Sequence, residues 1–368
     1  MRVLHLTTHL NMGGITIYIY RLIAPLRKLG IETFVLSGGG DYAEKFRKRG
    51  ATVFELPIRT KSEINPRIYL ALPELKKIIR ENKIDLIHAH TRVTQVMAFW
   101  IQKMTAVPVV ATCHGFYKRR LGRRLLPAWG DRTIAISEGV AGHLENDLKV
   151  PKEKIRTVQN GIDLEEIDKG YAKHVPAVVK KEYGFKEQDP VIGVVARLVQ
   201  DKGHEYLIDA IRILRKEFPA IRLLIVGDGK FRPALQKLVE QLKLTDAVYL
   251  LGNIEDVTKP LSAINIFALP ATWREGFGLS IVEAMACRKP VIVSNIWALN
   301  TLIQNESTGI LVEPKKSDVL AAAIAKLLKD PAKQRVISEK GRQAVEKYFG
   351  IDRMADGLAG VYKELVPG

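Results

Sequence analysis

The sequence predicts an α/β protein made of two doubly wound, Rossmann-like domains. The chain has 368 residues, which is more than one ordinary hydrophobic core accommodates. Short apolar runs alternate with segments of helical length, a pattern typical of parallel sheets with helices on both faces. A polar, lysine-rich stretch at residues 164–190, interpreted as a linker with one helix, divides the pattern into two series. We therefore expect an N-terminal domain over residues 1–170 and a C-terminal domain over residues 171–349.

The first series consists of buried-strand patterns and helical patterns in alternation. The strands are expected within residues 2–8, 31–40, 52–58, 84–90, 107–115, 132–137 and 154–163, and the helices within residues 15–30, 72–83 and 138–148. In the second of these helices, Leu75, Ile78 and Ile79 recur at the spacing of one helix face.

The second series repeats the alternation after the linker. Its strands are expected within residues 191–199, 221–229, 247–254, 264–270, 290–295 and 309–314, and its helices within residues 203–218, 231–244, 275–290, 317–330 and from about 331 onward. Pro233 suits the first turn of its helix, because that position needs no backbone N–H donor. Ser317 is expected to be an N-cap, since its side chain can accept a hydrogen bond from the first turn.

The composition is that of a globular protein, with 47% hydrophobic and 26% charged residues. No apolar run approaches the ~20 residues that cross a bilayer, and the N-terminus is interpreted as a strand rather than a signal peptide. Cys113 and Cys287 lie far apart in sequence, so we expect no disulfide and a reducing, cytoplasmic location. His88 and His90 end a strand, but without a third ligand nearby in the sequence we expect no metal.

The net charge is +17, and its densest cluster is the segment 117–124. The basic side chains of this segment are Lys118, Arg119, Arg120, Arg123 and Arg124. Such a surface binds phosphate groups of nucleic acid, anionic lipid or a phosphorylated substrate. The alternative is a solvated loop that only keeps the protein soluble.

Two glycine turns and two cations follow strands, at the edge where doubly wound domains bind ligands. Gly13 and Gly14 follow the first strand, and Gly227 follows a strand of the second series. Small residues there let the backbone approach a phosphate or a sugar, although a plain tight turn needs them too. Arg197 and Lys202 in "ARLVQDKG" suit a diphosphate, and the alternative is a pair of surface cations.

The segment "EGFGLSIVE" joins a strand to a helix and carries two carboxylates. Gly276 and Gly278 precede a helix start, whose free N–H groups and positive dipole end favour a diphosphate. Glu275 would then lie beside a sugar, and Glu283 could accept hydrogen bonds from a ribose diol. The alternative is a helix-capping acid followed by a solvated acid on the helix.

These motifs together resemble the retaining glycosyltransferases of family four, also described as glycosyl transferases group 1. The resemblance covers nearly the whole chain: the first "GG" turn, "HG" at 114–115, "AISEGVAGHL", "VQNGID", "ARLVQDKG", "VGDG", "LGNI", "EGFGLSIVE" and "EAMACRKPVI" occur in the family's order. It implies the GT-B fold, with two Rossmann-like domains facing across a cleft. The N-terminal domain would bind the acceptor, with the tail from about 350 to 368 packed back on it, and the C-terminal domain would bind the nucleotide sugar.

The resemblance also implies roles for individual residues. Glu275 would contact the donor sugar, and Glu283 the ribose of the nucleotide. The diphosphate would lie against Arg197, Lys202 and the backbone at Gly276, Phe277, Gly278 and Leu279. The remaining donor contacts would come from Gly13, Gly14, Gly227, the backbone near Ile254, and His114 close to the sugar.

The implied reaction moves a sugar from a UDP- or GDP-linked donor to an acceptor hydroxyl with retention of configuration. Arg197 and Lys202 would stabilise the departing diphosphate, so no metal or other cofactor is expected. Family members often act on lipid-linked cell-envelope precursors, which suggests a peripheral position on the inner face of the plasma membrane. Pro270 lies five residues before Glu275 where many relatives have four, so Trp273 or Arg274 could contact an acceptor or only cover the cleft.

Two other classes of protein are compatible with parts of the pattern. A nucleotide-sugar 2-epimerase would keep the nucleotide site, but the two spaced glutamates argue against it. A nucleic-acid-binding protein would suit the net charge of +17, yet no RNA-binding aromatic pattern or helix-turn-helix signature supports it, so no nucleic-acid partner is expected.

Overall fold

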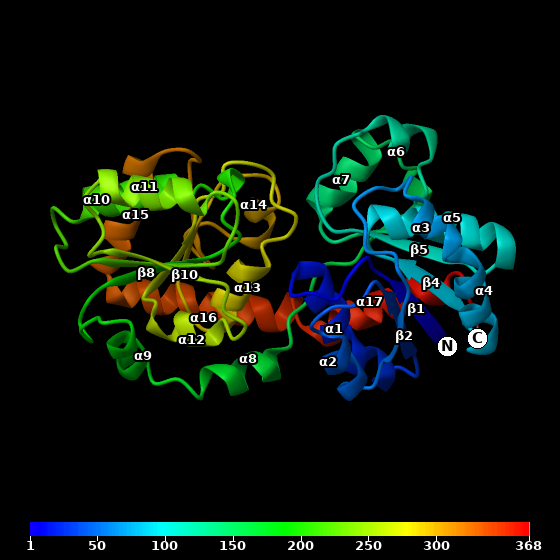
Figure 1. The fold of residues 1–368 in the computed structure, drawn as a ribbon. Helices are drawn as coiled ribbons and strands as arrows, with labels where there is room; N and C mark the ends of the chain where they lie inside the picture. The colour runs from blue at the N-terminus through cyan, green and yellow to red at the C-terminus, as the bar shows by residue number, and fades with distance from the viewer. Residues whose placement is uncertain (368) are drawn as a thin grey trace. The chain divides into compact units, whose positions relative to one another are not determined.

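The structure, a computed structural model, describes residues 1–367, which form two compact α/β units (Figure 1). The first unit combines Met1–Gly161 with the C-terminal segment from Ile351, and the second unit is Ile162–Gly350. The second unit thus starts before residue 170, where the sequence pattern placed the division. The reason is helix α8 (Leu164–Tyr171), which packs on other helices of the second unit.

The first unit is built on a parallel sheet of seven strands, as the alternating pattern predicted. In spatial order they are β3 (Thr52–Glu55), β2 (Glu32–Ser37), β1 (Arg2–Leu6), β4 (Leu86–Ala89), β5 (Val109–Cys113), β6 (Arg132–Ala135) and β7 (Ile155–Thr157). In the register, Leu4 lies opposite Phe34 on one side and Ile87 on the other. The strand order reverses between β1 and β4, so the loops after these strands border the crevice that such folds use for ligands.

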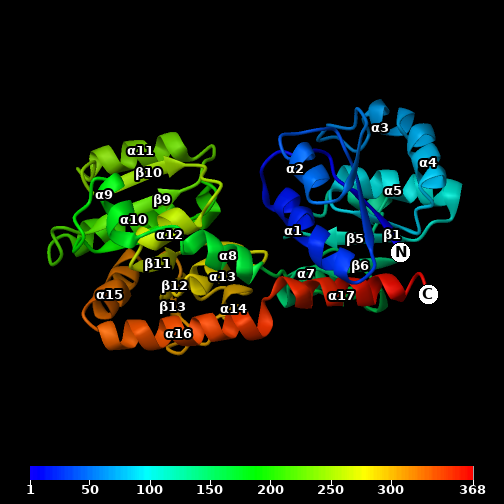
Figure 2. The same cartoon turned by 90° about the horizontal axis from the view of Figure 1, so that it is seen from below.

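The helices of the first unit cover its sheet. They are α1 (Gly14–Lys28), α2 (Ala43–Lys48), α3 (Pro66–Leu70), α4 (Leu72–Glu81), α5 (Arg92–Thr105), α6 (Leu121–Leu125), α7 (Glu138–Asn146) and α17 (Ile351–Lys363), with a 3-10 helix at Lys152–Lys154. The sequence pattern did not indicate α5, although Thr91 caps it by accepting from Thr94 N–H. Helix α17 packs on α1 and belongs to this unit (Figure 2).

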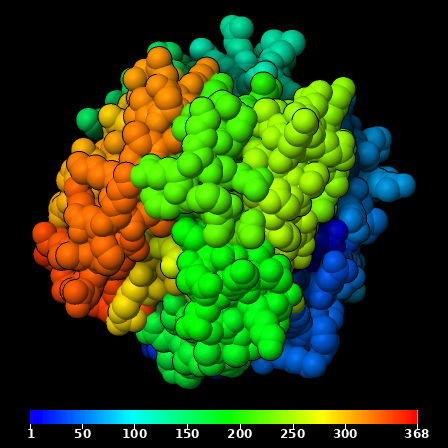
Figure 3. All heavy atoms as spheres, turned by 90° about the vertical axis from the view of Figure 1, so that its left-hand side faces the viewer, coloured from blue at the N-terminus to red at the C-terminus, as the bar shows by residue number. Residues whose placement is uncertain are grey.

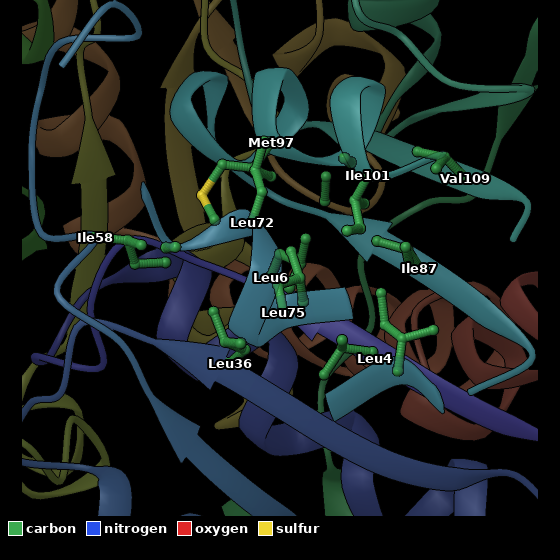
Figure 4. Packing of buried hydrophobic residues seen from close by; sticks show 14 of the residues in the cluster. Leu4, Leu6, Leu36, Ile58, Leu72, Leu75, Ile87, Met97, Ile101 and Val109 are labelled. Carbon is green, nitrogen blue, oxygen red and sulfur yellow. The ribbon is translucent and has the colours of Figure 1, made fainter. Parts of the chain in front are cut away.

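A continuous apolar cluster fills the space between this sheet and helices α4 and α5 (Figure 4). Leu4, Leu6 and Ile87 project from the central strands and are fully buried. Leu75 from α4 and Met97 from α5 close the cluster from the helical side. Each such side chain contributes roughly 1.5–3 kcal/mol of burial free energy, so this cluster fixes the strands whose ends carry the functional loops.

The second unit has a parallel sheet of six strands, again as predicted. In spatial order they are β10 (Val248–Gly252), β9 (Arg222–Val226), β8 (Val191–Val195), β11 (Ile266–Leu269), β12 (Val291–Ser294) and β13 (Ile310–Val312). The order reverses between β8 and β11. The loops that carry Arg197 and Glu275 therefore leave neighbouring strands at the carboxyl edge of the sheet.

Nine α-helices surround this sheet within the described residues. They are α8, α9 (Pro176–Glu182), α10 (His204–Leu214), α11 (Arg232–Gln241), α12 (Thr258–Ala263), α13 (Leu279–Ala286), α14 (Leu299–Leu302), α15 (Ser317–Leu328) and α16 (Pro331–Tyr348), with a 3-10 helix at Gln200–Lys202. In Figure 3 the green surface of the α10 region lies between the orange of α15 and the yellow-green of α11.

Two local predictions for the second unit were wrong. Residues 164–190 hold two helices, α8 and α9, rather than a linker with one helix, because Asp163 caps α8 and Pro176 starts α9. Ser317 is the first helical residue of α15 and not its cap; the capping position is Lys316, which makes no side-chain capping bond.

Both cysteines, Cys113 and Cys287, are buried and free, as expected. Among the described residues, no helix combines the length and the apolar character that a membrane span requires.

Candidate active site

The loop after β8 carries the two predicted cations. Leu198 N–H donates to the carbonyl of Asp228, which ties this loop to the loop after β9, and Arg197 is exposed beside it. His204, the first residue of α10, lies behind the loop with its Nε2 3.1 Å from the Arg197 carbonyl oxygen. Burial lowers the pKa of His204 to about 4, so the ring is neutral and donates this hydrogen bond. The sequence pattern did not single out His204.

The loops after β8 and β11 are held together at their backbones. Thr272 N–H donates to the carbonyl of Asp201 at 2.9 Å. Gly203 has φ 68°, and a Cβ at this position would lie 2.0 Å from the carbonyl oxygen of Pro270. Only glycine therefore lets the two loops approach this closely.

This approach brings Lys202 and Glu275 into contact. Their side chains form an ion pair between Nζ and Oε2, and each is 16% exposed. The two residues are 73 positions apart in the chain. A half-buried, paired cation and carboxylate can bind the charged and hydroxyl groups of one ligand, with the Lys202 ammonium on the anionic part.

Helix α13 starts beside this pair. Gly278 precedes it with φ 88°, and no side chain caps the helix. The first N–H groups of a helix have no intrahelical acceptors, so the backbone at Leu279 offers donors at the positive end of the helix dipole. The Phe277 side chain is buried and its ring packs edge-on against Phe349 at 5.7 Å. Phe277 thus anchors the turn through its side chain.

Glu283 lies one turn further along α13, among fully buried side chains. It is 7% exposed, and its neighbours Ile281, Val282 and Met285 are completely buried. The interpretation of Glu283 as a solvated helix acid is therefore wrong. A carboxylate in this position is expensive to bury unless it accepts hydrogen bonds.

Gly227 and Ile254 follow the next strands of the same edge. Gly227 has φ 132°, and a Cβ there would lie 2.1 Å from the Ala196 carbonyl oxygen. Its N–H donates to the Gly252 carbonyl oxygen at 2.7 Å. The need for glycine at 227 is thus already explained by the fold. Ile254 is half-buried in the loop after β10.

In the first unit, Gly13 and Gly14 are exposed at the start of α1. Gly13 has an extended φ of 168°, and a Cβ on Gly14 would meet nothing within 4 Å. The backbone conformation therefore does not require glycine at these two positions. The effect of the glycines is the open space that their missing side chains leave above the start of α1.

His114 follows β5 in a loop fixed on both sides. Cys113 Sγ donates to the Gly115 carbonyl oxygen at 3.2 Å, and Tyr117 N–H donates to His143 Nε2 at 2.9 Å. The His114 ring meets the Tyr18 ring edge-on at 4.7 Å. Burial lowers the pKa of His114 to about 3, which keeps the ring neutral.

A histidine cluster lies behind His114. One ring nitrogen from each of His5, His88 and His90 lies within 4.8 Å of the other two. His5 is the third neighbour that the sequence pattern lacked, because it lies on β1 and becomes adjacent only through the β1–β4 pairing. The feature that identifies His5 as a member of the cluster is its position in the register, directly opposite His88.

The basic segment separates into two kinds of side chain. Lys118, Arg119, Arg120 and Arg124 are exposed, together with Leu121 at 65% and Leu125 at 77%. Arg123 differs from them, because its guanidinium lies 5.0 Å from the ring centre of Tyr117 and 4.7 Å from that of Trp129. Its cation–π contacts give Arg123 a packing role.

The chain matches two family descriptions in sequence. Residues 12–166 match "Glycosyltransferase Family 4" and residues 177–344 match "Glycosyl transferases group 1". A UDP-Gal:alpha-D-GlcNAc-diphosphoundecaprenol alpha-1,3-galactosyltransferase of Escherichia coli is 29% identical over 316 residues, which are 80% of this chain and 79% of the relative. An N-acetyl-alpha-D-glucosaminyl L-malate synthase of Bacillus anthracis is 26% identical over 304 residues, 80% and 78% of the two chains.

Solved structures show the same fold. A glycosyltransferase from Rickettsia africae aligns with a TM-score of 0.89 at 23% identity, over 100% of this chain and 99% of its own. The Anabaena protein HepE in complex with UDP-glucose aligns with a TM-score of 0.85 at 21% identity, over 99% and 100%. The comparisons give no support to an epimerase or a nucleic-acid-binding protein. The chain has the GT-B fold and belongs to the group 1, family 4 glycosyltransferases, hexosyl-transferring enzymes whose donor is a nucleotide sugar.

Proposed function

We propose that the protein transfers a sugar from a UDP- or GDP-linked donor to a hydroxyl of a lipid-linked cell-envelope precursor, with retention of configuration. The observation that carries this proposal is the Lys202–Glu275 pair beside the α13 start. A cation, a carboxylate and free helix N–H groups at one sheet edge suit the diphosphate and the sugar of such a donor. The relatives named above include one that uses UDP-Gal and a structure that holds UDP-glucose.

In this proposal the diphosphate lies against Arg197, Lys202 and the N–H groups at the start of α13. Negative charge grows on the diphosphate as the sugar–phosphate bond breaks, and preorganised donors stabilise that charge most in the transition state. Lys202 then exchanges its contact with Glu275 for the phosphate oxygens. Glu275 becomes available to the sugar hydroxyls, and Glu283 accepts from the ribose diol. The two cations make a metal ion unnecessary.

Retention needs the acceptor to attack the face that the diphosphate leaves. The sugar acquires oxocarbenium character, and in this proposal Glu275, once Lys202 has moved to the phosphate, binds the sugar hydroxyls rather than attacking the anomeric carbon. We therefore favour front-side attack, in which the departing phosphate oxygen takes the proton of the acceptor hydroxyl. The bond from the anomeric carbon to phosphate breaks as the bond to the acceptor oxygen forms on the same face.

The acceptor would bind the first unit, with the exposed basic side chains directed to a membrane. Leu121 and Leu125, the first and last residues of α6, are exposed and each follows an exposed arginine, Arg120 or Arg124. Apolar side chains beside arginines suit an anionic lipid surface. The relative from Escherichia coli is named for a diphosphoundecaprenol acceptor, which supports a lipid-linked substrate.

The donor assignment is tested with purified protein and a panel of UDP-, GDP- and ADP-sugars. We expect slow hydrolysis of one donor, and a loss of at least about 100-fold in Glu275→Gln or Lys202→Met. Glu187→Gln and Lys216→Met, both exposed and away from this edge, serve as matched controls. Inert donors, together with no thermal stabilisation by any nucleoside diphosphate, would refute the proposal. A product epimeric with the donor sugar would instead favour the epimerase.

Membrane association is tested by sedimentation with vesicles of phosphatidylcholine, with and without phosphatidylglycerol. The wild type should bind only the anionic vesicles, and Arg119→Glu/Arg124→Glu should release it. Equal binding of both proteins would show that the basic segment does not contact lipid.

A further inference from the structure

Three histidines form a hydrogen-bonded chain through the core of the first unit. His5 Nδ1 lies 2.9 Å from His90 Nε2, and His90 Nδ1 lies 3.1 Å from His114 Nε2. The chain starts on β1, crosses the end of β4 and reaches the loop after β5, where His114 is half-buried. It therefore connects the interior of the sheet to the edge where ligands of this fold bind.

All three rings are neutral. His5 and His90 are completely buried, and burial lowers the pKa of His5 to about 3 and that of His90 well below its ordinary value. A neutral imidazole has one N–H donor and one bare acceptor nitrogen. The two hydrogen bonds can thus be made in only two ways, with all donors directed either toward His114 or toward His5.

The inner end of the chain distinguishes these two arrangements. His5 Nε2 is buried and has no hydrogen-bond partner within residues 1–367. If the donors were directed toward His5, this atom would be an orphaned N–H. If they were directed toward His114, it would be a bare lone pair. Buried orphaned N–H groups are rarer and more costly than unsatisfied acceptors.

We propose that His5 and His90 are positioning residues that hold His114 as its Nδ1–H tautomer. His5 Nδ1–H donates to His90 Nε2, and His90 Nδ1–H donates to His114 Nε2. The single proton of His114 is then on Nδ1, which makes no hydrogen bond to any described residue. His114 presents this N–H donor to a ligand oxygen at the carboxyl edge of its own sheet; that this ligand is a sugar rests on the function proposed above, whereas the tautomer does not.

His88 does not take part in this chain of hydrogen bonds, and its own contacts argue against a metal site. Its Nδ1 lies 2.7 Å from the Tyr362 hydroxyl and its Nε2 2.6 Å from Thr112 Oγ1. Both nitrogens are thus occupied, while His5 and His90 are bonded to each other. The ring nitrogens therefore satisfy one another or hydroxyl groups instead of converging on one ion.

The proposal is tested first on the wild-type protein without substrate. The chain has eight histidines, few enough for ¹⁵N-detected NMR of the ring nitrogens at pH 7 with assignment by single substitutions. We expect His5, His90 and His114 as Nδ1–H tautomers. A His114 that carries its proton on Nε2, an imidazolium at any of the three sites, or a stoichiometric metal found by elemental analysis would overturn the proposal.

Two variants then link the tautomer to activity. His90→Phe keeps a buried ring but removes both nitrogens, so His114 should lose its fixed Nδ1–H form. We expect kcat for donor hydrolysis to fall about 10-fold, the equivalent of one hydrogen bond, with a KM within about 2-fold. The matched control is His88→Gln on β4, two residues before His90, which should leave the His114 tautomer unchanged. An unchanged His114 tautomer in His90→Phe would contradict the proposed chain of hydrogen bonds. If this variant does not fold, the spectrum of the wild-type protein alone decides the proposal. Inert donors with the expected tautomers would refute the proposed function and leave this inference standing.

Discussion

Lowering the pH from 7 to 5 should weaken the first unit more than the second, because several histidines of the first unit are held neutral in the folded state, whereas among the described residues of the second unit His204 alone is. Burial holds the pKa of His5 and of His114 at about 3, against the ordinary value of 6.5. Between these values the unfolded chain binds more protons than the folded one, so stability is fully present above pH 6.5 and is lost as the pH falls toward 3.

The size of the effect follows from the same values. A pH of 5 lies 1.5 units below 6.5, the pKa of a histidine in the unfolded chain. At 1.36 kcal/mol per unit, each histidine that stays neutral in the folded state therefore lowers the free energy of unfolding by about 2 kcal/mol. His5 and His114 together cost about 4 kcal/mol, a large part of the 5–15 kcal/mol that stabilises a typical domain. His88 and His90 act in the same direction. The phenols of Tyr18 and Tyr362 also lie against these rings, and because burial raises their pKa they do not titrate in this range.

Amide hydrogen exchange in β1 and β4 measures the opening free energy of this unit separately from the other. The wild type should lose at least about 4 kcal/mol between pH 7 and pH 5. His5→Asn keeps a polar partner for His90 but does not titrate, so its loss should be smaller by about 2 kcal/mol. The same pH dependence in both proteins would refute the claim that His5 is buried in its neutral form.

Three further substitutions test the packing around the site. Phe277→Ala should cost the second unit about 3–5 kcal/mol in a urea titration, because the buried ring packs on Phe349; a loss below about 1 kcal/mol would contradict that anchor. Gly203→Ala should cost more than about 1 kcal/mol in the same titration, since a Cβ would overlap the Pro270 carbonyl, and a neutral result would mean that the loops lie further apart. Arg123→Ala should lower the Tm by a few degrees through its lost ring contacts, whereas an unchanged Tm would place Arg123 with the exposed cations.

The pattern of strands and helices was predictable because it depends on local periodicity. All thirteen strands lie within runs that alternate with helical segments. Helix α5 was missed because its apolar residues are dense enough to obscure the helical period. Ser317 was a plausible cap by residue type, but the chain enters helix α15 one residue earlier.

The candidate site could be predicted only where it is local in sequence. The Glu275–Glu283 segment is contiguous, so its helix start and its two acids could be predicted directly from the sequence. The Lys202–Glu275 pair joins residues of two loops, and it depends on the close approach that Gly203 permits. His5 was overlooked for the same reason, since a single histidine within an apolar strand acquires meaning only when β1 pairs with β4.

The most direct test of the central claim is the configuration of the sugar in the first product formed. A time course of proton NMR on the wild-type protein with its preferred UDP- or GDP-sugar follows the anomeric proton before mutarotation. We predict that the first-formed sugar keeps the anomeric configuration of the donor, and that Lys202→Met forms no product on the same time scale. A first product with the opposite configuration would contradict the proposed front-side attack at the β8–β11 edge.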